Sequence, residues 1–369
     1  MASDKSNFLT YGTAAKASEI VRFLDHFIKI NRKAEAEGKR RTPVCIWGSH
    51  GIGKTELVEE FAASKGFQMA YVAPAQFEEM GDLLGMPQII ENKTHFAPPE
   101  WVPKQKGPGI LLIDDVNRAD DRILRGIMQL LQNYELVSWK LPLDWHIVLT
   151  ANPDGGDYSV TPLDDAMLTR MRHITMQFDI KEWVKWASRN GIDQRGIHFV
   201  LSNQKLFNGN RTTPRTLVHF FEAIEGLKDL KKNKKLVQLL GEASLDKETV
   251  VAFLNFIDRQ LSDFPSSDSI LNTTDFQNKV EIPLRQIVVG EQIRNDILYT
   301  ISVQLLNHLE QIKTTLSEEQ IKNFKSFLKM DFFPADLRFS VAQDIANSSK
   351  TQIKNILSDP DLSTLLLAV

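Results

Sequence analysis

The sequence predicts an α/β fold with a largely parallel sheet in its first half and an all-helical second half. Short apolar runs occur at 44–47, 67–73, 109–114 and 145–152, and helix-like or loop-like stretches separate them. This alternation is typical of parallel sheets whose strands are joined by crossover helices. After about residue 180 the strand signal almost disappears, while helical apolar spacing continues.

The first elements follow from the spacing of their apolar residues. Residues 13–37 carry apolar side chains at helical spacing, namely Ile20, Phe23, Leu24, Phe27 and Ile28. The charged segment 35–43 then ends this predicted helix before the strand at 44–47. The run 110–113 contains no polar residue, as expected for a strand that is covered on both faces.

The second half is predicted from helical stripes at 181–190, 214–226, 246–261, 292–312 and 317–329. The segment 262–278 is rich in turn-forming and polar residues, and we interpret it as a separator between two helical units. We therefore expect an α/β domain at 1–180, a helical domain at 181–261 and a helical C-terminal region at 262–369. The lysine-rich run 228–235 is interpreted as a solvated connection, with nucleic-acid contact as the alternative.

The composition narrows the class of protein. Of the 369 residues, 42% are hydrophobic and 25% are charged, and the formal net charge of −3 gives no global attraction for nucleic acid or anionic membranes. The single cysteine, Cys45, excludes an internal disulfide and a multi-cysteine zinc site. The N-terminus has no signal-peptide pattern, and no stretch of about twenty apolar residues follows. We expect a cytoplasmic protein without a membrane segment.

The segment 48–55, GSHGIGKT, fits the phosphate-binding pattern G-x-x-x-x-G-K-[ST] between an apolar strand and a helix. Its glycines let backbone N–H groups converge on phosphate oxygens, and the following helix offers its positive N-terminal end. Lys54 would neutralise the outer phosphates, and Thr55 would ligate magnesium. The alternative is a merely glycine-rich turn.

Two carboxylates follow the next buried strand. Asp114 and Asp115 stand at its C-terminal end, which is where ligands bind in open α/β sheets. Asp114 would hold magnesium through water, and Asp115 would orient or deprotonate an attacking water. The alternative is that both carboxylates cap the helix that begins near residue 120.

Further polar candidates follow the third strand. Asn152 ends the run 145–152, and its amide can hydrogen-bond both the attacking water and the terminal phosphate. Arg170, Arg172 and Arg215 are candidates for stabilising charge on a transferring phosphoryl group, in cis or from a neighbouring subunit. Each arginine alone is also consistent with a surface or ion-pair residue.

In combination and in their order, these segments resemble an AAA+ ATPase. The residues within each segment resemble those of the MoxR family of that superfamily. DDVNRAD at 114–120 is similar to the family's Asp-Glu-φ-Asn-Arg-Ala segment, and EMGDLLGMP at 79–87 to its Asp-Leu-Leu-Gly loop. TPRTLVHF at 213–220 is similar to its Ser-Pro-Arg sensor helix. The resemblance covers roughly residues 12–226, and midasin and dynein-type modules share the Asp-Leu-Leu-Gly segment.

This resemblance implies an AAA+ P-loop parallel-sheet domain followed by an all-helical lid, with ATP and Mg²⁺ as cofactors. Asn152 would be sensor 1, Arg215 sensor 2, and Arg170 the arginine finger, with Arg172 as the alternative finger. Thr55 and Asp114 would hold the metal. The implied ATP-binding residues are Gly48, Ser49, His50, Gly51, Ile52, Gly53, Lys54, Thr55 and Glu56.

The resemblance also implies a homo-oligomeric ring, usually of six subunits, that remodels a protein client. Such proteins typically work with a separate von Willebrand factor A domain protein. The family's catalytic glutamate is Asp115 here, and an error in positioning a catalytic group can reduce the rate by about a hundredfold. The resulting hypothesis is slow hydrolysis, or hydrolysis only after a partner tightens the site. The alternatives are a nucleic-acid-associated motor or loader, a nucleotide-gated scaffold and, ranked last, a small-molecule kinase.

Overall fold

A computed structural model of the chain describes residues 11–153, 160–203, 211–258, 265–289, 294–348 and 350–367. The chain divides into two compact units, Met1–Asp179 and Ile180–Val369. Within the described residues, no helix is both long enough and apolar enough to cross a membrane.

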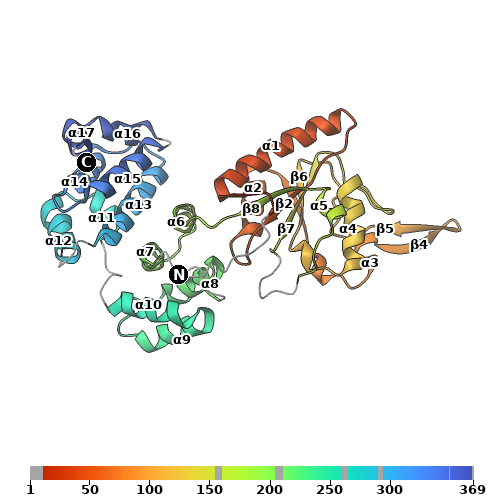
Figure 1. Ribbon diagram of the computed structural model, residues 1–369, viewed down its shortest axis with the longest axis horizontal. Coiled ribbons are helices and arrows are strands. Elements are labelled where there is room, and N and C mark those ends of the chain that lie inside the picture. The colour runs from red at the N-terminus through yellow and green to blue at the C-terminus, as the bar shows by residue number, and fades with distance from the viewer. Residues whose placement is uncertain are drawn as a thin grey trace. The chain divides into compact units, whose positions relative to one another are not determined.

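The first unit contains a six-stranded sheet in the order β1-β8-β2-β7-β6-β3, and every pairing in it is parallel (Figure 1). Its strands are β1 (Thr13–Ala15), β2 (Val44–Trp47), β3 (Gln68–Val72), β6 (Gly109–Ile113), β7 (Trp145–Ala151) and β8 (Arg172–Met176). The helices of this unit are α1 (Ala17–Ala36), α2 (Lys54–Lys65), α3 (Met80–Leu84), α4 (Asp121–Asn133) and α5 (Asp165–Leu168). The predicted α/β class is confirmed.

Helices cover both faces of the sheet. Ile110 and Leu112 of β6 pack in one apolar cluster with α1 and α2. Leu111 and Ile113 pack in the other cluster with α4. Alternate side chains of a strand point to opposite faces, so this arrangement explains why the run 110–113 is apolar throughout.

A two-stranded antiparallel hairpin projects from the first unit (Figure 1). It consists of β4 (Met86–Ile90) and β5 (Lys93–Ala97), and α3 precedes it. Met86 and Ile89 are 70% and 81% exposed. At its base the side chains of Trp101, Ser138 and Trp139 donate hydrogen bonds to carbonyl oxygens of α3. The base is therefore anchored, whereas the strands are open to solvent.

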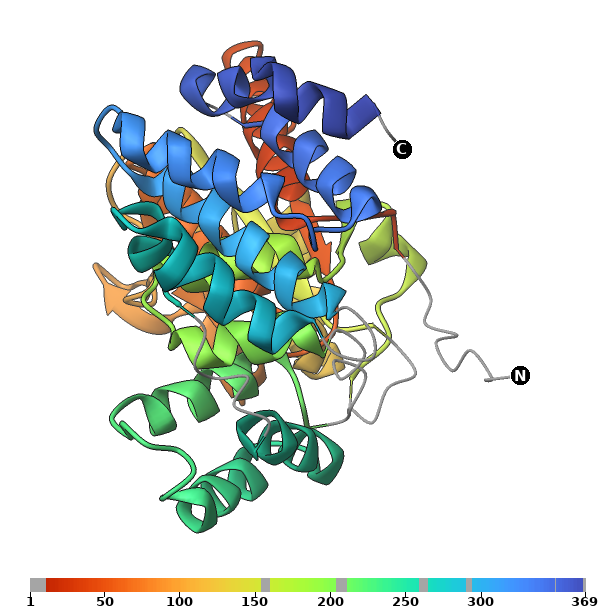
Figure 2. The same ribbon diagram turned by 90° about the vertical axis from the view of Figure 1, so that its left-hand side faces the viewer.

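The second unit is built from helices. They are α6 (Ile180–Arg189), α7 (Gln194–Ser202), α8 (Pro214–Glu225), α9 (Lys234–Ser244), α10 (Lys247–Asp258), α11 (Ser267–Leu271), α12 (Ile282–Val288), α13 (Asn295–Gln311), α14 (Glu318–Lys329), α15 (Ala335–Ala346), α16 (Thr351–Lys354) and α17 (Pro360–Leu367). Figures 1 and 2 show the helices from α11 onwards side by side, and α13 packs against α7, α11 and α15. The predicted helical second half is confirmed.

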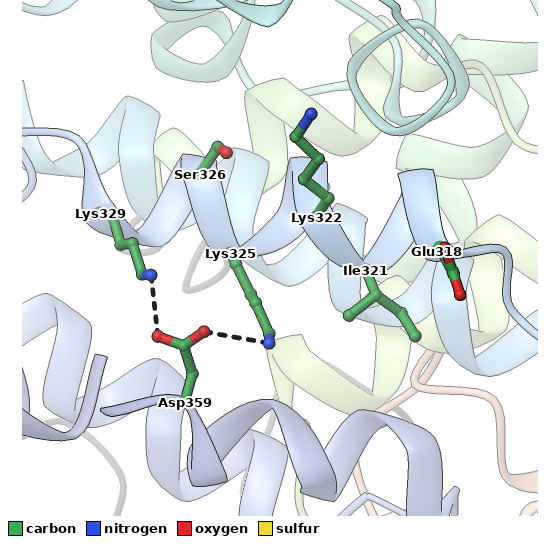
Figure 3. Close-up of a pocket in the computed structure, with 7 residues that line it drawn as sticks. All are labelled: Glu318, Ile321, Lys322, Lys325, Ser326, Lys329 and Asp359. Carbon is green, nitrogen blue, oxygen red and sulfur yellow. Dashed lines mark ion pairs between the residues drawn. The ribbon is translucent and has the colours of Figure 1, made fainter. Parts of the chain in front are cut away.

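One open pocket of this unit lies on α14 (Figure 3). The carboxylate of Asp359 forms ion pairs with Nζ of Lys325 at 3.0 Å and with Nζ of Lys329 at 2.8 Å. Lys322 points away from it (Figure 3). These pairs hold the pKa of Asp359 well below its usual range. The pocket is therefore a place where two lysines tie α14 to the start of α17.

The local structure differs from two expectations. The helix expected over 13–37 begins only at Ala17, because Thr13–Ala15 pairs with β8 as an edge strand. The separator expected at 262–278 contains α11, whose Ile270 and Leu271 are fully buried. Residues 262–264 of that separator lie outside the described residues. In both places tertiary packing overrides the local sequence signal.

Candidate nucleotide site

The loop between β2 and α2 has the backbone geometry that its glycines permit. Gly51 has φ +67° and Gly53 has φ +99°, and both values lie in the left-handed region that glycine tolerates. Gly53 is the residue before the first turn of α2, which begins at Lys54. The N–H of Gly48 donates to the carbonyl of Ala151 at 3.2 Å, which fixes the loop beside the end of β7.

Lys54 is 5% exposed and points back over this loop. Its Nζ donates to the carbonyl oxygens of Gly48 at 2.8 Å and Ser49 at 3.2 Å, and to Oδ1 of Asn152 at 3.0 Å. A buried ammonium group requires such partners. These bonds place the positive charge inside the glycine-rich loop and join the loop to the end of β7.

The other predicted loop residues differ in burial. Ser49 is exposed and His50 is half-buried. Ile52 packs against the apolar cluster under α1 and α2, so it anchors the loop. Glu56 is an exposed residue in the first turn of α2.

Asp114 accepts hydrogen bonds from three hydroxyl groups. Its Oδ1 accepts from Thr55 Oγ1 at 2.7 Å and from Thr150 Oγ1 at 2.6 Å. Its Oδ2 accepts from the phenol of Tyr71 at 3.1 Å. Partial burial and the negative charge of Asp114 raise the pKa of Tyr71 to about 12, so the phenol stays a donor at neutral pH.

Asp115 has a left-handed backbone with φ +47°. Its N–H donates to Thr150 Oγ1 at 2.8 Å. Its carboxylate accepts from Nδ2 of Asn152 at 2.9 Å, and its second oxygen pairs with Nε of Arg118 at 3.2 Å. Both carboxylate oxygens and the backbone of Asp115 therefore have a defined direction.

Asn152 connects these groups. Its side chain bridges Lys54 and Asp115, because the oxygen accepts from the first and the nitrogen donates to the second. Asn117 holds the backbone of Asn152 through two bonds, one from Nδ2 to its carbonyl at 2.7 Å and one from its N–H to Oδ1 at 3.1 Å. Both asparagines are 0% exposed. This network is buried and paired, which favours a single geometry.

The oxygen atoms near α2 suit a magnesium ion carried by a nucleotide. Thr55 and Asp114 supply a hydroxyl and a carboxylate oxygen 2.7 Å apart, and Mg²⁺ prefers oxygen ligands together with water and phosphate. Within the described residues, no group of three or more histidine, cysteine, aspartate or glutamate side chains forms a metal cluster. The donor set therefore fits a metal that is shared with phosphate.

Comparisons with known proteins place this geometry in context. Residues 43–171 match the family model of the AAA domain (dynein-related subfamily). The match supports an AAA domain in this part of the chain. Midasin of Giardia intestinalis is 26% identical over 155 residues, which make up 40% of this chain and 3% of midasin. The chain therefore spans a small part of the length of that relative.

Distant structural neighbours of this chain include RuvB of Thermotoga maritima. The RuvB Holliday junction branch migration motor is 15% identical, with a TM-score of 0.39 over 83% of this chain and 94% of that chain. A substituted RuvB from the same organism is 15% identical, with a TM-score of 0.41 over 73% of this chain and 87% of its own.

Within the described residues, the candidate arginines form no hydrogen bond or ion pair with these site residues. Arg170 follows α5 and donates from Nε to Gln132 at 3.2 Å and from its guanidinium to the carbonyl of Ala166. Arg172 begins β8 opposite Val44, the first residue of β2. It therefore lies at the N-terminal ends of the strands, whereas the site residues follow their C-terminal ends. Arg215 is an exposed residue in the first turn of α8, in the second unit.

Four residues of the network were not predicted. Asn117 and Arg118 lie within the motif DDVNRAD, but the motif does not predict which residues they contact. Thr150 is a polar residue directly after the apolar residues 147–149, which is a signal that can be read from the sequence. Tyr71 has no such signal, because an aromatic residue is ordinary in a strand.

Proposed function

We propose that this chain is an ATP-binding and ATP-hydrolysing AAA+ remodelling motor that acts on a protein client through an oligomeric ring. The observation that carries the proposal is the linked network at the C-terminal edge of the sheet. It joins the loop lysine, Lys54, to the carboxylate of Asp115 through the side chain of Asn152.

The chain's own residues divide the work of the proposed reaction. The N–H groups of the loop and Lys54 bind the phosphates. Thr55 and Asp114 would hold magnesium, which when bound neutralises charge on the phosphates. Asp115 orients a water for attack and accepts its proton. Asn152 fixes the side chains of Asp115 and Lys54 relative to each other, because it is hydrogen-bonded to both.

Completion of the site by a second copy is part of the proposal. Arg170 is proposed as the finger that reaches a neighbouring subunit's nucleotide, with Arg172 as the alternative. Their position outside the chain's own network supports a role in trans. Arg215 is proposed as sensor 2, and the helical domain at 181–261 as the lid. An arginine that stabilises transferring phosphoryl charge is worth about 10³–10⁵ in rate, so an isolated chain would be a slow ATPase.

The client is proposed to be a protein, as in MoxR-like chaperones that work with a separate von Willebrand factor A domain protein. The exposed apolar side chains of the β4–β5 hairpin support a contact with a polypeptide, because exposed apolar patches mark interaction sites. The anchored base of the hairpin would transmit movement of α3 to its strands.

The test is ATP binding and steady-state hydrolysis by the wild type and two lysine variants of α2. Lys54→Ala should weaken ATP binding by about 100-fold, because a charge-assisted contact to phosphate is lost. Lys65→Ala changes an exposed lysine at the end of α2 that pairs with Asp25 of α1, and it should bind and hydrolyse ATP normally. Equal ATP affinity in Lys54→Ala and the wild type would refute the nucleotide site.

A second candidate is a nucleotide-gated scaffold with slow hydrolysis. It is favoured by Asp115, whose two carboxylate oxygens are engaged by Asn152 and Arg118. An aspartate that keeps both partners would be a weak base for water. Equal client action with ATP and with a non-hydrolysable analogue would favour the scaffold, whereas action only with ATP favours the motor.

A further inference from the structure

We infer that Thr150 is a positioning residue that aligns the metal-holding carboxylate and the catalytic carboxylate of this site with one hydroxyl group. The inference rests on the proposed function, since it concerns the same nucleotide site. It assigns Thr150 a role that is exerted through Asp114 and Asp115.

The hydroxyl of Thr150 uses both of its hydrogen-bonding capacities within the site. It donates to Asp114 Oδ1 at 2.6 Å and accepts from the N–H of Asp115 at 2.8 Å. A hydroxyl has one hydrogen to donate, and here that hydrogen is committed to the carboxylate. One atom therefore sets the rotation of Asp114 and the position of the next backbone amide.

The backbone at Asp115 needs such a support. Its φ of +47° lies in the left-handed region, which is strained for a non-glycine residue and persists only where the surroundings hold it. The bond from its N–H to Thr150 is one such hold, and the bond from Asn152 to its carboxylate is another. Without the bond to Thr150, the backbone at Asp115 can relax and move the carboxylate away from Asn152.

The burial of Thr150 argues against an incidental contact. Its residue is 0% exposed, and it lies on β7 one residue before Ala151, where the neighbouring strand residues are apolar. Burying a hydroxyl is unfavourable unless it is hydrogen-bonded, and valine has nearly the same shape. Packing alone would therefore be satisfied by valine, whereas the two bonds require the hydroxyl.

The closing experiment compares Thr150→Val, Thr150→Ser and a matched control, Thr175→Val, in the full chain. Thr175 lies on β8 in the same sheet, and its hydroxyl donates to the carbonyl of Tyr11 at 2.8 Å, outside the network. ATP binding is measured in EDTA and in magnesium, and kcat and KM are measured separately. Thr150→Ser keeps the hydroxyl, so it tests rescue.

Thr150→Val should bind ATP in EDTA within about twofold of the wild type, because it leaves Lys54 and the loop intact. Its kcat should fall by about 10- to 100-fold with a smaller change in KM, and the gain in affinity on adding magnesium should shrink. Thr150→Ser should recover most of the kcat and of the magnesium effect. Thr175→Val should behave like the wild type.

Two results would overturn the inference: a kcat in Thr150→Val equal to that of Thr175→Val, or an equal loss in Thr150→Ser and Thr150→Val. If Thr150→Val does not fold, Thr150→Ala replaces it, since alanine and serine differ only by the hydroxyl. Failure of the proposed function looks different, because the wild type itself then does not hydrolyse ATP. In that case an unchanged magnesium effect on nucleotide affinity in Thr150→Val still refutes the role of Thr150.

Discussion

At the scale of single residues, the proposed chemistry depends on the direction of Asp115. Asn152 and Arg118 fix its two oxygens, and Thr150 fixes its backbone N–H. The aspartate side chain is one methylene shorter than the glutamate of the resembling family. The left-handed backbone and these three contacts show how a short side chain is held at a defined place.

Asp115→Asn should trap ATP. The amide keeps the size of the side chain and loses the ability to accept a proton from water, so kcat should fall by about 10²–10⁴-fold. ATP affinity should stay near that of the wild type, because Lys54 and Thr55 are unchanged. Single-turnover hydrolysis and retention of labelled ATP measure both effects.

The control for this variant is Asp121→Asn, an exposed carboxylate in the first turn of α4. It should hydrolyse ATP at the wild-type rate. Wild-type turnover by Asp115→Asn would remove Asp115 from the chemistry. The alternative that Asp114 and Asp115 cap α4 is wrong, because Asp120 caps that helix by accepting from the N–H of Ile123.

Much of the site is readable from sequence because strand ends of a parallel sheet meet at one edge. Lys54, Asp114 and Asn152 follow three strands that are neighbours in the sheet, so their proximity is a consequence of topology. The direction of each side chain is not readable in this way. Tyr71 comes from a fourth strand, and only the pairing of β3 with β6 brings its phenol to Asp114.

At the scale of elements, the β4–β5 hairpin depends on Gly85. This residue joins α3 to β4 with φ +88°, and a Cβ atom there would lie 1.9 Å from the carbonyl oxygen of Ala97. Gly85→Ala should therefore loosen the hairpin, with a cost of about 1–3 kcal/mol beyond the backbone strain. Faster hydrogen exchange of the hairpin amides and a lower thermal midpoint are the measurements.

Gly66→Ala is the matched control for that change. Gly66 ends α2 with φ +66°, and a Cβ atom there has nothing within 4 Å. It should cost only the strain of a left-handed residue, about 1–2 kcal/mol, and leave hairpin exchange unchanged. Equal hairpin exchange in the two variants would show that the hairpin does not depend on close approach at Gly85.

The start of β7 makes the stability of the first unit sensitive to acid. Burial lowers the pKa of His146 from 6.5 to about 4, although Asp144 at 3.2 Å opposes the shift. The unfolded chain takes up the proton first, so the contribution of neutral His146 is complete above pH 6.5 and is lost as pH falls towards 4. The free energy of unfolding should drop by about 2 kcal/mol from this group between pH 7 and pH 5.

Urea unfolding of the wild type and His146→Gln at both pH values measures this contribution. The variant should lose about 2 kcal/mol less than the wild type over this interval. His26→Gln changes an exposed histidine on α1 and should follow the wild type. Identical pH dependence in His146→Gln and the wild type would contradict the assignment.

Element prediction succeeded where a local pattern decides the structure and failed where pairing decides it. The strands at 44–47 and 109–113 are apolar runs that two helical layers cover. The strand β1 has three residues, and its pairing with β8, which lies far along the chain, cannot be read from local spacing. The hairpin was missed for another reason, since its exposed strands lack the alternation that burial of one face produces.

At the scale of the whole molecule, the proposed mechanism of hydrolysis requires a second copy of the chain. The chain forms two compact units, and the boundary expected between 181–261 and 262–369 within the second unit remains a prediction. The proposed finger, Arg170, takes part in no described contact with the chain's own nucleotide network. A role in hydrolysis therefore has to be exerted across a subunit interface.

Arg170→Ala should spare ATP binding and remove ring-dependent hydrolysis, with a fall in kcat of about 10³-fold or more. Arg172→Ala receives the same test, because Arg172 is the alternative finger. Arg122→Ala, which changes an exposed arginine paired with Asp120, is the control. Normal turnover by both Arg170→Ala and Arg172→Ala would exclude the proposed interface.

The proposal that hydrolysis needs a second copy of the chain can be tested by light scattering or native mass measurement with and without ATP. ATPase rates are measured on the same samples. The account predicts an assembly that forms or tightens with nucleotide, with hydrolysis per chain that rises as the assembly forms. A chain that stays monomeric while hydrolysing ATP at a rate independent of its concentration would contradict the account.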